Sequence, residues 1–310
     1  MTKKPSKIRK FKDQGALAFA GIFQFPLSIF HFFTFCLFFF PPVAFAQKIA
    51  LLTPEKNERA VEFASKLENS FSGKLLLLDR NLSETAFNAV VYENPFNLSL
   101  EESKNIGAAI GCNYFLLIQA RTLRRFSLEK KDYYESFAAV FAVSSRTGRL
   151  IYWNLISRPA ANPAGAEESL SNSADDLAAE IIKAVTEADK KEANEDRPAK
   201  LEELPEETAP EAKNFRPPLP FKRIRPRYTE IADLYGIEAT VDILLDVDET
   251  GRIIKTEISR WAGFGLDESV TETVREMNWR PASRNGKTLP MRVLLRYNFK
   301  KIENNKETEQ

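Results

Sequence analysis

The chain has 310 residues, which as a prior suggests about two domains, and its 44 basic side chains nearly balance its 43 acidic ones. This near-neutral charge argues against a general nucleic-acid-binding protein, and an apolar fraction of 44% argues against wholesale disorder. The only histidine is His31, and beyond residue 46 the only cysteine is Cys112. Residues 47–310 therefore lack the side chains for Ser-His-Asp or Cys-His catalysis and for histidine-ligated or multi-cysteine metal sites, although carboxylate or lysine chemistry stays open. We expect a binding protein without enzymatic activity or a cofactor.

Residues 1–46 carry the pattern of a secretory signal peptide. A basic beginning is followed by a dense apolar run over residues 27–40. Ala44 and Ala46 then form a small-x-small cleavage site before Gln47. On this interpretation the mature protein begins at Gln47 and is secreted.

An uncleaved membrane anchor is the alternative interpretation of the same segment. The uncharged stretch that begins at Gly15 is longer than the roughly 20 residues that a spanning helix needs, so residues 15–40 are long enough to hold the chain in the inner membrane. Basic residues before the stretch would keep the N-terminus in the cytoplasm. Both interpretations place residues 47–310 outside the cytoplasm, where Cys112 is expected to be an inert buried thiol.

Residues 47–188 are expected to form an α/β domain, because strand-like and helical patterns alternate along them. The continuous apolar run at residues 74–79 is typical of a strand buried on both faces. Pro54 marks the start of a helix, since proline is tolerated in the first helical turn. The expected strands are 48–53, 74–79, 114–123, 133–144 and 150–157, and the later helices are 83–91, 100–110 and 167–188.

The remaining chain divides into a linker, a second unit and a tail. Residues 189–214 are charged and contain three prolines, which is typical of a disordered, solvated linker. Residues 215–301 predict a smaller α+β unit, and residues 302–310 predict a flexible tail. Within the unit, the expected helices are 229–235 and 266–277, the expected strands are 238–247, 252–259 and 291–299, and turns are expected at 248–251 and 285–286.

This second unit resembles the TonB C-terminal domain over residues 218–299. The segments that carry the resemblance are Arg225-Pro-Arg-Tyr228, Tyr235-Gly-Ile-Glu-Ala-Thr-Val241, Asp246-Val-Asp-Glu-Thr-Gly-Arg-Ile253, Leu266-Asp267, Trp279-Arg-Pro281, Asn285-Gly-Lys287 and the closing strand Leu294 to Phe299. The resemblance implies a three-stranded antiparallel sheet with two helices on one face. It also implies a periplasmic protein of a bacterium with two membranes.

The resemblance further implies a function in energised transport. Members of the family bind an extended segment of an outer-membrane transporter or receptor by adding it as a strand to the sheet edge. The well-known members also engage an inner-membrane proton-channel complex. By this analogy the last strand is the edge, and the candidate partner-binding residues are Arg225, Arg227, Tyr228, Arg292, Leu294, Arg296 and Asn298.

Several departures from the family leave a second function open. Thr229 stands where the family has proline, and Ala239 stands where it has glycine. The Ser/His pair of the family's anchor helix is echoed by Ser28 and His31, but their spacing is one residue short. The long proline-rich spacer is replaced by the α/β domain. The alternative is a secreted periplasmic binding or scaffold protein that uses the domain for protein contacts without energy coupling.

The first unit has a looser likeness to α/β domains of bacterial envelope assembly lipoproteins. The pieces that carry it are residues 106–115, a helix end followed by a strand, and residues 144–150, a turn between two strands. No function is inferred from this likeness.

Overall fold

The computed structural model describes residues 47–126, 132–195, 201, 205 and 213–301, all of which belong to one compact unit, Ala46–Gln310. The predicted cleavage site at Ala44 and Ala46 and the candidate anchor positions Ser28 and His31 lie outside the described residues. Within the described part, no helix is both long enough and apolar enough to cross a membrane.

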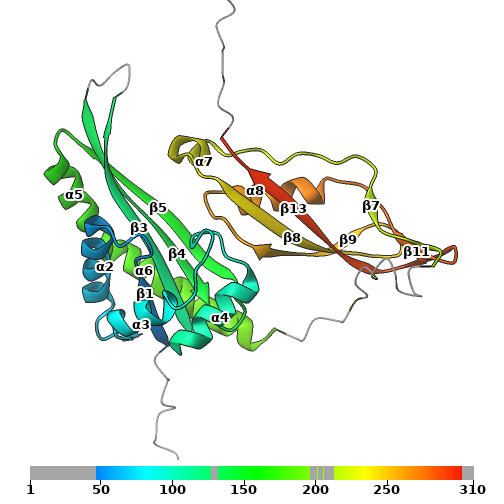
Figure 1. Cartoon of the computed structure of the whole chain (residues 1–310), viewed down its shortest axis with the longest axis horizontal. Helices are drawn as coiled ribbons and strands as arrows, with labels where there is room; N and C mark the ends of the chain where they lie inside the picture. Colours follow the sequence, from blue (N-terminus) through cyan, green and yellow to red (C-terminus); the bar gives the residue numbers. More distant parts are fainter. Residues whose placement is uncertain (1–46, 127–131, 196–200, 202–204, 206–212, 302–310) are drawn as a thin grey trace, which may run out of the picture. The chain divides into compact units, whose positions relative to one another are not determined.

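A five-stranded mixed sheet organises the N-terminal part of the chain, in the order β2-β1-β3-β4-β5 (Figure 1). Strand β1 is parallel to β2 and β3, whereas β3, β4 and β5 are antiparallel neighbours. Every strand predicted for this region is present, so the mixed α+β class is confirmed here. The strands are β1 (Lys48–Leu52), β2 (Leu76–Leu77), β3 (Tyr114–Arg125), β4 (Tyr133–Ser144) and β5 (Leu150–Ala160).

Strand β2 differs from its prediction as a strand buried on both faces. It contains only two paired residues and lies at the edge of the sheet, where Leu76 is 47% exposed. An apolar run shows that a segment tends to be buried, but the order of strands depends on contacts between segments far apart in the chain. The local pattern therefore does not distinguish a central strand from an edge strand.

The helices of this part begin at side-chain caps. Helix α2 starts at Glu58 rather than at Pro54, because the Asn57 side chain accepts a hydrogen bond from the Ala60 N–H at 2.9 Å. The single helix predicted at 167–188 is two helices, and the second continues into the segment predicted to be linker. The helices are α2 (Glu58–Phe71), α3 (Arg80–Phe87), α4 (Leu100–Ile110), α5 (Pro163–Ser171) and α6 (Ala174–Ala193).

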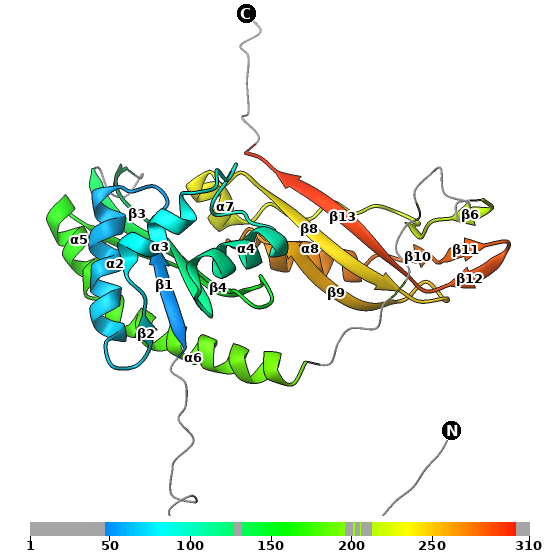
Figure 2. The same ribbon diagram turned by 60° about the horizontal axis from the view of Figure 1, so that its bottom comes forward.

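Alternate side chains of β3 serve two different cores, because successive residues of a strand point to opposite faces of the sheet. Leu116 and Ile118 pack in a cluster with residues of α2, α5 and α6. Figure 2 shows these helices beside the first sheet. Phe115 and Leu117 face the opposite side, in a cluster with residues of α3 and α4. The first sheet is therefore covered on both faces.

A three-stranded antiparallel sheet with the order β13-β8-β9 organises the C-terminal part (Figure 1). Val241, Ile243 and Leu245 of β8 pack in one cluster with Val270 and Val274 of helix α8. These strands and helices confirm the architecture that the family resemblance implied. They are α7 (Glu230–Tyr235), β8 (Ala239–Val247), β9 (Ile253–Arg260), α8 (Leu266–Arg275) and β13 (Met291–Phe299).

Short strands extend this part of the chain. The predicted turn at Asn285 and Gly286 joins β11 to β12, and both turn residues have positive φ angles, 51° and 80°. Two further antiparallel pairings join β11 to β6 and β10 to β7. The short strands are β6 (Phe215–Arg216), β7 (Leu219–Pro220), β10 (Trp279–Arg280), β11 (Ala282–Arg284) and β12 (Lys287–Leu289).

One hydrophobic cluster contains residues of both sheets. Phe141 of β4 stacks on Trp261 with ring centroids 5.7 Å apart, and it also contacts Phe264 at 5.8 Å. Trp153 of β5 contacts Phe264 at 5.6 Å. The loop that follows β9 thus packs its aromatic side chains directly on the first sheet.

Candidate functional site at the sheet edges

Strand β13 forms one edge of the three-stranded sheet, as the family resemblance implied. It pairs with β8 along its whole length, from Met291 opposite Val247 to Phe299 opposite Ala239. Val293 and Tyr297 are buried on the core side. The predicted partner-binding residues Arg292, Leu294, Arg296 and Asn298 alternate with them and lie together on the opposite face.

Two of these predicted residues bind their own sheet. Arg292 donates to the Asp246 carboxylate at 2.6 and 2.8 Å, and Arg296 donates to the Asp242 carboxylate at 2.7 and 2.8 Å. Both aspartates are only 6% exposed, and the bidentate pairs provide their carboxylates with hydrogen-bond donors. Arg260 also lies 3.7 Å from the Asp242 carboxylate. Hydrogen bonding to Asp242 raises the pKa of Arg296. The arginines therefore join β13 to β8 by side-chain ion pairs.

One side-chain contact shows which backbone N–H and C=O groups of β13 point away from β8. Arg223 donates from Nη2 to the Arg296 carbonyl oxygen at 3.3 Å, so this carbonyl points away from β8. In antiparallel pairing the N–H and C=O of a residue point the same way, and the direction alternates along the strand. The backbones of Arg292, Leu294, Arg296 and Asn298 thus face the free edge.

The basic segment 222–228 lies beside this edge and contacts it through side chains. The Arg223 guanidinium lies 5.5 Å from the centre of the Tyr297 ring, and Tyr228 stacks on Phe299 at 6.2 Å. Burial raises the pKa of Tyr228, whose hydroxyl is also 2.8 Å from the Ile237 carbonyl oxygen. The structure therefore brings predicted Tyr228 to β13 and adds Arg223, which belongs to the basic segment but was not among the candidate partner-binding residues.

The other two predicted residues of this segment are placed differently. Arg225 and Arg227 are exposed, and their side chains make no hydrogen bond or ion pair within the described part of the chain. The Arg227 carbonyl oxygen accepts a hydrogen bond from Ser269 Oγ at 2.8 Å, which anchors the segment to α8. Both side chains are thus available to an acidic partner but are not held at the edge.

A cavity of about 480 Å³ lies at the end of β13. Arg296 and Asn298 line it, together with Asn94 and Asn97 from the first part of the chain. The Asn97 side chain accepts from the Thr240 N–H at 2.9 Å and donates to the Thr240 carbonyl at 2.8 Å. The Asn97 side chain thus takes the place of a neighbouring strand at the start of β8. The sequence alone did not predict this role.

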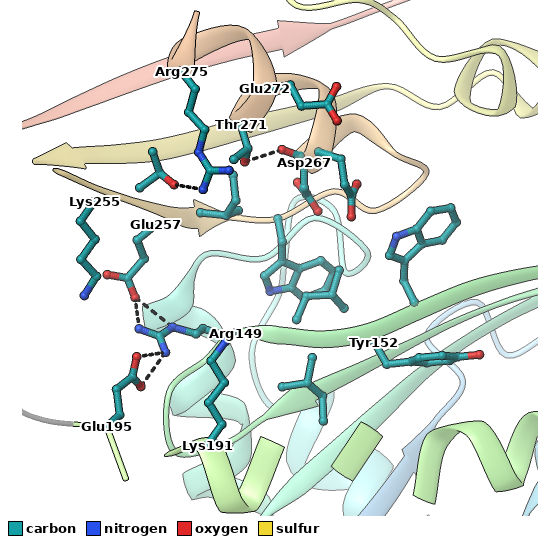
Figure 3. Close-up of a pocket in the computed structure, with 17 residues that line it drawn as sticks. Arg149, Tyr152, Lys191, Glu195, Lys255, Glu257, Asp267, Thr271, Glu272 and Arg275 are labelled. Carbon is teal, nitrogen blue, oxygen red and sulfur yellow. Dashed lines mark hydrogen bonds and ion pairs between the residues drawn. The ribbon is translucent and has the colours of Figure 1, made fainter. Parts of the chain in front are cut away.

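A second cavity, the β5–β9 groove, has a volume of about 620 Å³ (Figure 3). Strand β5 forms one edge of the first sheet, and β9 forms the other edge of the second sheet. The sequence marked neither edge as a site. The groove is lined by residues 149–153 and 255–258, by residues 267, 268, 271, 272 and 275 of α8, and by Lys191, Glu195 and Trp261.

Arg149 joins the walls at one end of the groove. Its guanidinium donates to Glu257 of β9 at 2.6 and 3.0 Å and to Glu195 at 2.7 Å (Figure 3). Burial alone would lower the pKa of Arg149, but the two carboxylates outweigh it and raise that pKa. Arg149 therefore stays charged and links β5 to β9.

A buried carboxyl group and a buried indole also line the groove. Asp267 accepts hydrogen bonds from the Ala262 and Gly263 N–H groups at 2.9 Å each. Burial raises the pKa of Asp267 to about 7, against the opposing effect of these N–H groups. Trp261 is 1% exposed, and its Nε1 has no hydrogen-bond partner within the described part.

The C-terminal part of the chain matches a known family. Residues 224–300 match the family "Gram-negative bacterial TonB protein C-terminal". The matched residues run from Ile224 in the basic segment to the residue after β13. The match confirms the resemblance first noted at residues 218–299. The three-stranded sheet and the β13 edge lie inside the matched residues.

Several solved structures have likeness to parts of the chain. The TonB C-terminal domain of Pseudomonas aeruginosa is 19% identical, with 33% of this chain and 95% of that chain covered and a TM-score of 0.25. A hypothetical protein of Chlamydia trachomatis is 14% identical, with 45% and 98% covered and a TM-score of 0.33. The LpoB C-terminal domain of Salmonella enterica is 16% identical, with 37% and 84% covered and a TM-score of 0.24. No curated protein matches the chain.

Proposed function

We propose that the chain is a cell-envelope protein whose β13 edge binds an extended segment of an outer-membrane transporter, in support of energised transport. The observation that carries the proposal is the position of β13: it is an edge strand inside the residues that match the TonB C-terminal family. Unpaired N–H and C=O groups on an edge give affinity for any extended backbone. The protein acts by binding, without catalysis.

The bound segment would compete with Arg223 for the edge. Arg223 already occupies the Arg296 carbonyl oxygen with a hydrogen bond of 3.3 Å. A strand that pairs with β13 would take this carbonyl as an acceptor, so the Arg223 side chain would leave it. Leu294, which is 48% exposed, gives the incoming strand an apolar contact on the outer face.

A periplasmic scaffold without energy coupling is the second candidate function. The observation that favours it is the shared core: Phe141 of the first sheet packs on Trp261 and Phe264 of the TonB-like part. A domain fixed in this way presents its edge from a rigid body instead of from a flexible spacer. In this case residues 1–46 would be cleaved at Ala46. Energy transduction instead requires the anchor at residues 15–40 and contact with a proton-channel complex.

A photo-crosslinking experiment in native cells tests the proposed site. A photoreactive amino acid is placed at Asn298, whose backbone faces the free edge, and the adducts are identified by mass spectrometry. We expect an outer-membrane transporter in the adduct. Leu294→Pro should abolish it, because proline removes an outward N–H that β8 does not use, whereas Leu294→Ala should keep it.

The thermal midpoint of each variant shows whether the sheet is folded. Adducts that persist in folded Leu294→Pro would overturn strand addition at β13. Adducts that contain only soluble periplasmic proteins would favour the scaffold function. The N-terminus of the native protein then separates the two further, since a chain that begins at Gln47 has no anchor.

A further inference from the structure

We propose that the β5–β9 groove is a second strand-addition site, which takes an extended peptide segment of a partner protein. The segment would carry an acidic residue toward Lys191 and Lys255 and a basic residue toward Glu268 and Glu272. The site is separate from the β13 edge, because β13 and β9 lie on opposite sides of β8. It therefore does not depend on the function proposed above.

Two unpaired sheet edges line the groove. In the described part of the chain, β9 has a strand neighbour only in β8, and β5 has one only in β4. Leu150 to Trp153 of the β5 edge and Lys255 to Ile258 of the β9 edge line one cavity of about 620 Å³ (Figure 3). This volume lies within the roughly 300–1,000 Å³ of ordinary ligand sites. An extended backbone is the ligand that supplies donors and acceptors to sheet edges.

The chain itself already pairs a segment with the end of β9. Ser99 forms an isolated antiparallel bridge with Arg260, the last residue of that strand. The Trp261 N–H also donates to the Leu98 carbonyl oxygen at 3.2 Å. The β9 strand is therefore competent to accept an antiparallel neighbour, and residues 255–258 are the part that this neighbour leaves unpaired.

Trp261 provides an independent indication of a missing ligand. Its side chain lines the groove, it is 1% exposed, and its Nε1 has no hydrogen-bond acceptor among the described residues. Buried indole N–H groups usually find a partner, because a buried donor without one is unfavourable. A carbonyl oxygen of a bound peptide backbone would supply this acceptor.

The charged side chains along the groove determine which charged residue a bound peptide should carry at each end. Arg149 is paired with two carboxylates, Glu195 and Glu257, so these three side chains together carry one excess negative charge. Lys191 and Lys255 beside Arg149 form no ion pair with any described residue, and neither do Glu268 and Glu272 on α8. At one end of the groove Arg149, Lys191 and Lys255 outnumber the carboxylates Glu195 and Glu257, although both lysines interact with Glu195. On α8 the carboxylates Glu268 and Glu272 outnumber Arg275, so the two ends have net charges of opposite sign. A peptide with the opposite polarity complements both ends.

Selection from a random twelve-residue peptide library displayed on phage tests the proposal, with the full chain as bait. Parallel baits are Glu268→Lys/Glu272→Lys and a matched control, Glu249→Lys/Glu276→Lys, which changes the net charge equally away from the groove. We expect the wild type and the control to enrich peptides with Lys or Arg toward one end. The groove variant should enrich Asp or Glu at that position instead.

Hydrogen exchange locates the selected peptides. Bound peptide should protect the amides of residues 150–153 and 255–258 and leave those of β13 unchanged. Trp261→Phe, which keeps the aromatic packing and removes the N–H, should weaken binding about threefold to tenfold. Failure to enrich any peptide, the same peptides from all baits, or protection confined to β13 would each overturn the proposal.

Discussion

The buried carboxyl group of Asp267 holds the turn between β9 and α8. Its two oxygens accept the Ala262 and Gly263 N–H groups, and this fixes the chain between β9 and α8. Burial raises the pKa of Asp267 from 3.8 to about 7. At the residue scale, the same side chain therefore determines the local backbone and makes stability depend on pH.

The pH dependence has a definite sign. Between pH 4 and 7 the folded chain keeps a proton on Asp267 that the unfolded chain loses, so this contribution to stability falls as pH rises. It is complete below pH 3.8 and lost as the pH passes about 7. In the wild type, the free energy of unfolding should fall by a total on the order of a few kcal/mol across this range because of Asp267. We expect Asp267→Asn to remove this fall.

Urea unfolding at a series of pH values measures this slope. Glu276→Gln is the matched control, because Glu276 is exposed at the far end of α8 and does not contribute to the pKa of Asp267. Asparagine resembles the protonated acid, with one acceptor oxygen and one donor group, so the variant should differ least from the wild type at low pH and gain stability relative to it as the pH rises. A wild-type slope retained in Asp267→Asn would show that Asp267 does not titrate in this range.

The β8–β9 hairpin shows what holds an element in place. The Asp248 side chain accepts from the Thr250 hydroxyl at 2.7 Å and from the Thr250 and Arg252 N–H groups at 2.8 and 2.9 Å. The Thr250 hydroxyl lowers the pKa of Asp248 most, and the two N–H groups lower it further. Gly251 has a φ of 84°, and a Cβ there would lie 2.1 Å from the Trp279 carbonyl oxygen. The turn is thus formed by local bonds and is packed tightly against β10.

Two glycine substitutions separate the strain of a positive φ from the clash with Trp279. Gly286→Ala introduces only the strain of a positive φ, since nothing lies within 4 Å of its Cβ, and should cost about 1–2 kcal/mol of unfolding free energy. Gly251→Ala adds the clash with Trp279 and should cost at least about 1–3 kcal/mol more. Denaturant midpoints and slopes of the two variants measure the difference. Equal losses would mean that the hairpin moves away from β10 without cost.

At the scale of the whole molecule, a few polar contacts complement the shared core. Asn97 holds both Thr240 and the Trp261 carbonyl, the latter at 2.6 Å. Tyr235 of α7 donates to Glu135 of β4 at 2.6 Å. Burial and the Glu135 contact raise the pKa of Tyr235 to about 12. The TonB-like part is therefore attached to the first sheet by specific hydrogen bonds as well as by aromatic packing.

Removal of the Asn97 side chain tests this attachment. Asn97→Ala leaves the Thr240 N–H and the Trp261 carbonyl without their partner, which should cost about 2–3 kcal/mol of unfolding free energy. Hydrogen exchange should show the largest loss of protection at the start of β8. Asn81→Ala, at an exposed site on α3, is the control and should change little. Unchanged protection at Thr240 would show that the core alone holds the two parts together.

Local sequence patterns were sufficient for many of the elements. Alternation and apolar runs predicted β4 at residues 133–144 and β13 at residues 291–299 with correct ends. The turn at Asn285 and Gly286 was predicted because these residues tolerate positive φ. The start of α2 at Glu58 was missed, because the cap of Asn57 competes with the proline signal at Pro54.

The sequence by itself determined the long strands and the hairpin turns, because each depends on residues close together in the chain, and the order of these motifs along residues 218–299 carried the TonB resemblance. It also placed Arg292, Leu294, Arg296 and Asn298 on one face of a strand, since alternation is local. Only the tertiary structure decided that the two arginines bind Asp246 and Asp242 and that Arg223 reaches the β13 edge. It alone brought β5 and β9 to one groove. These features join residues tens to more than a hundred positions apart, and burial and strand order, which no local pattern specifies, bring them together.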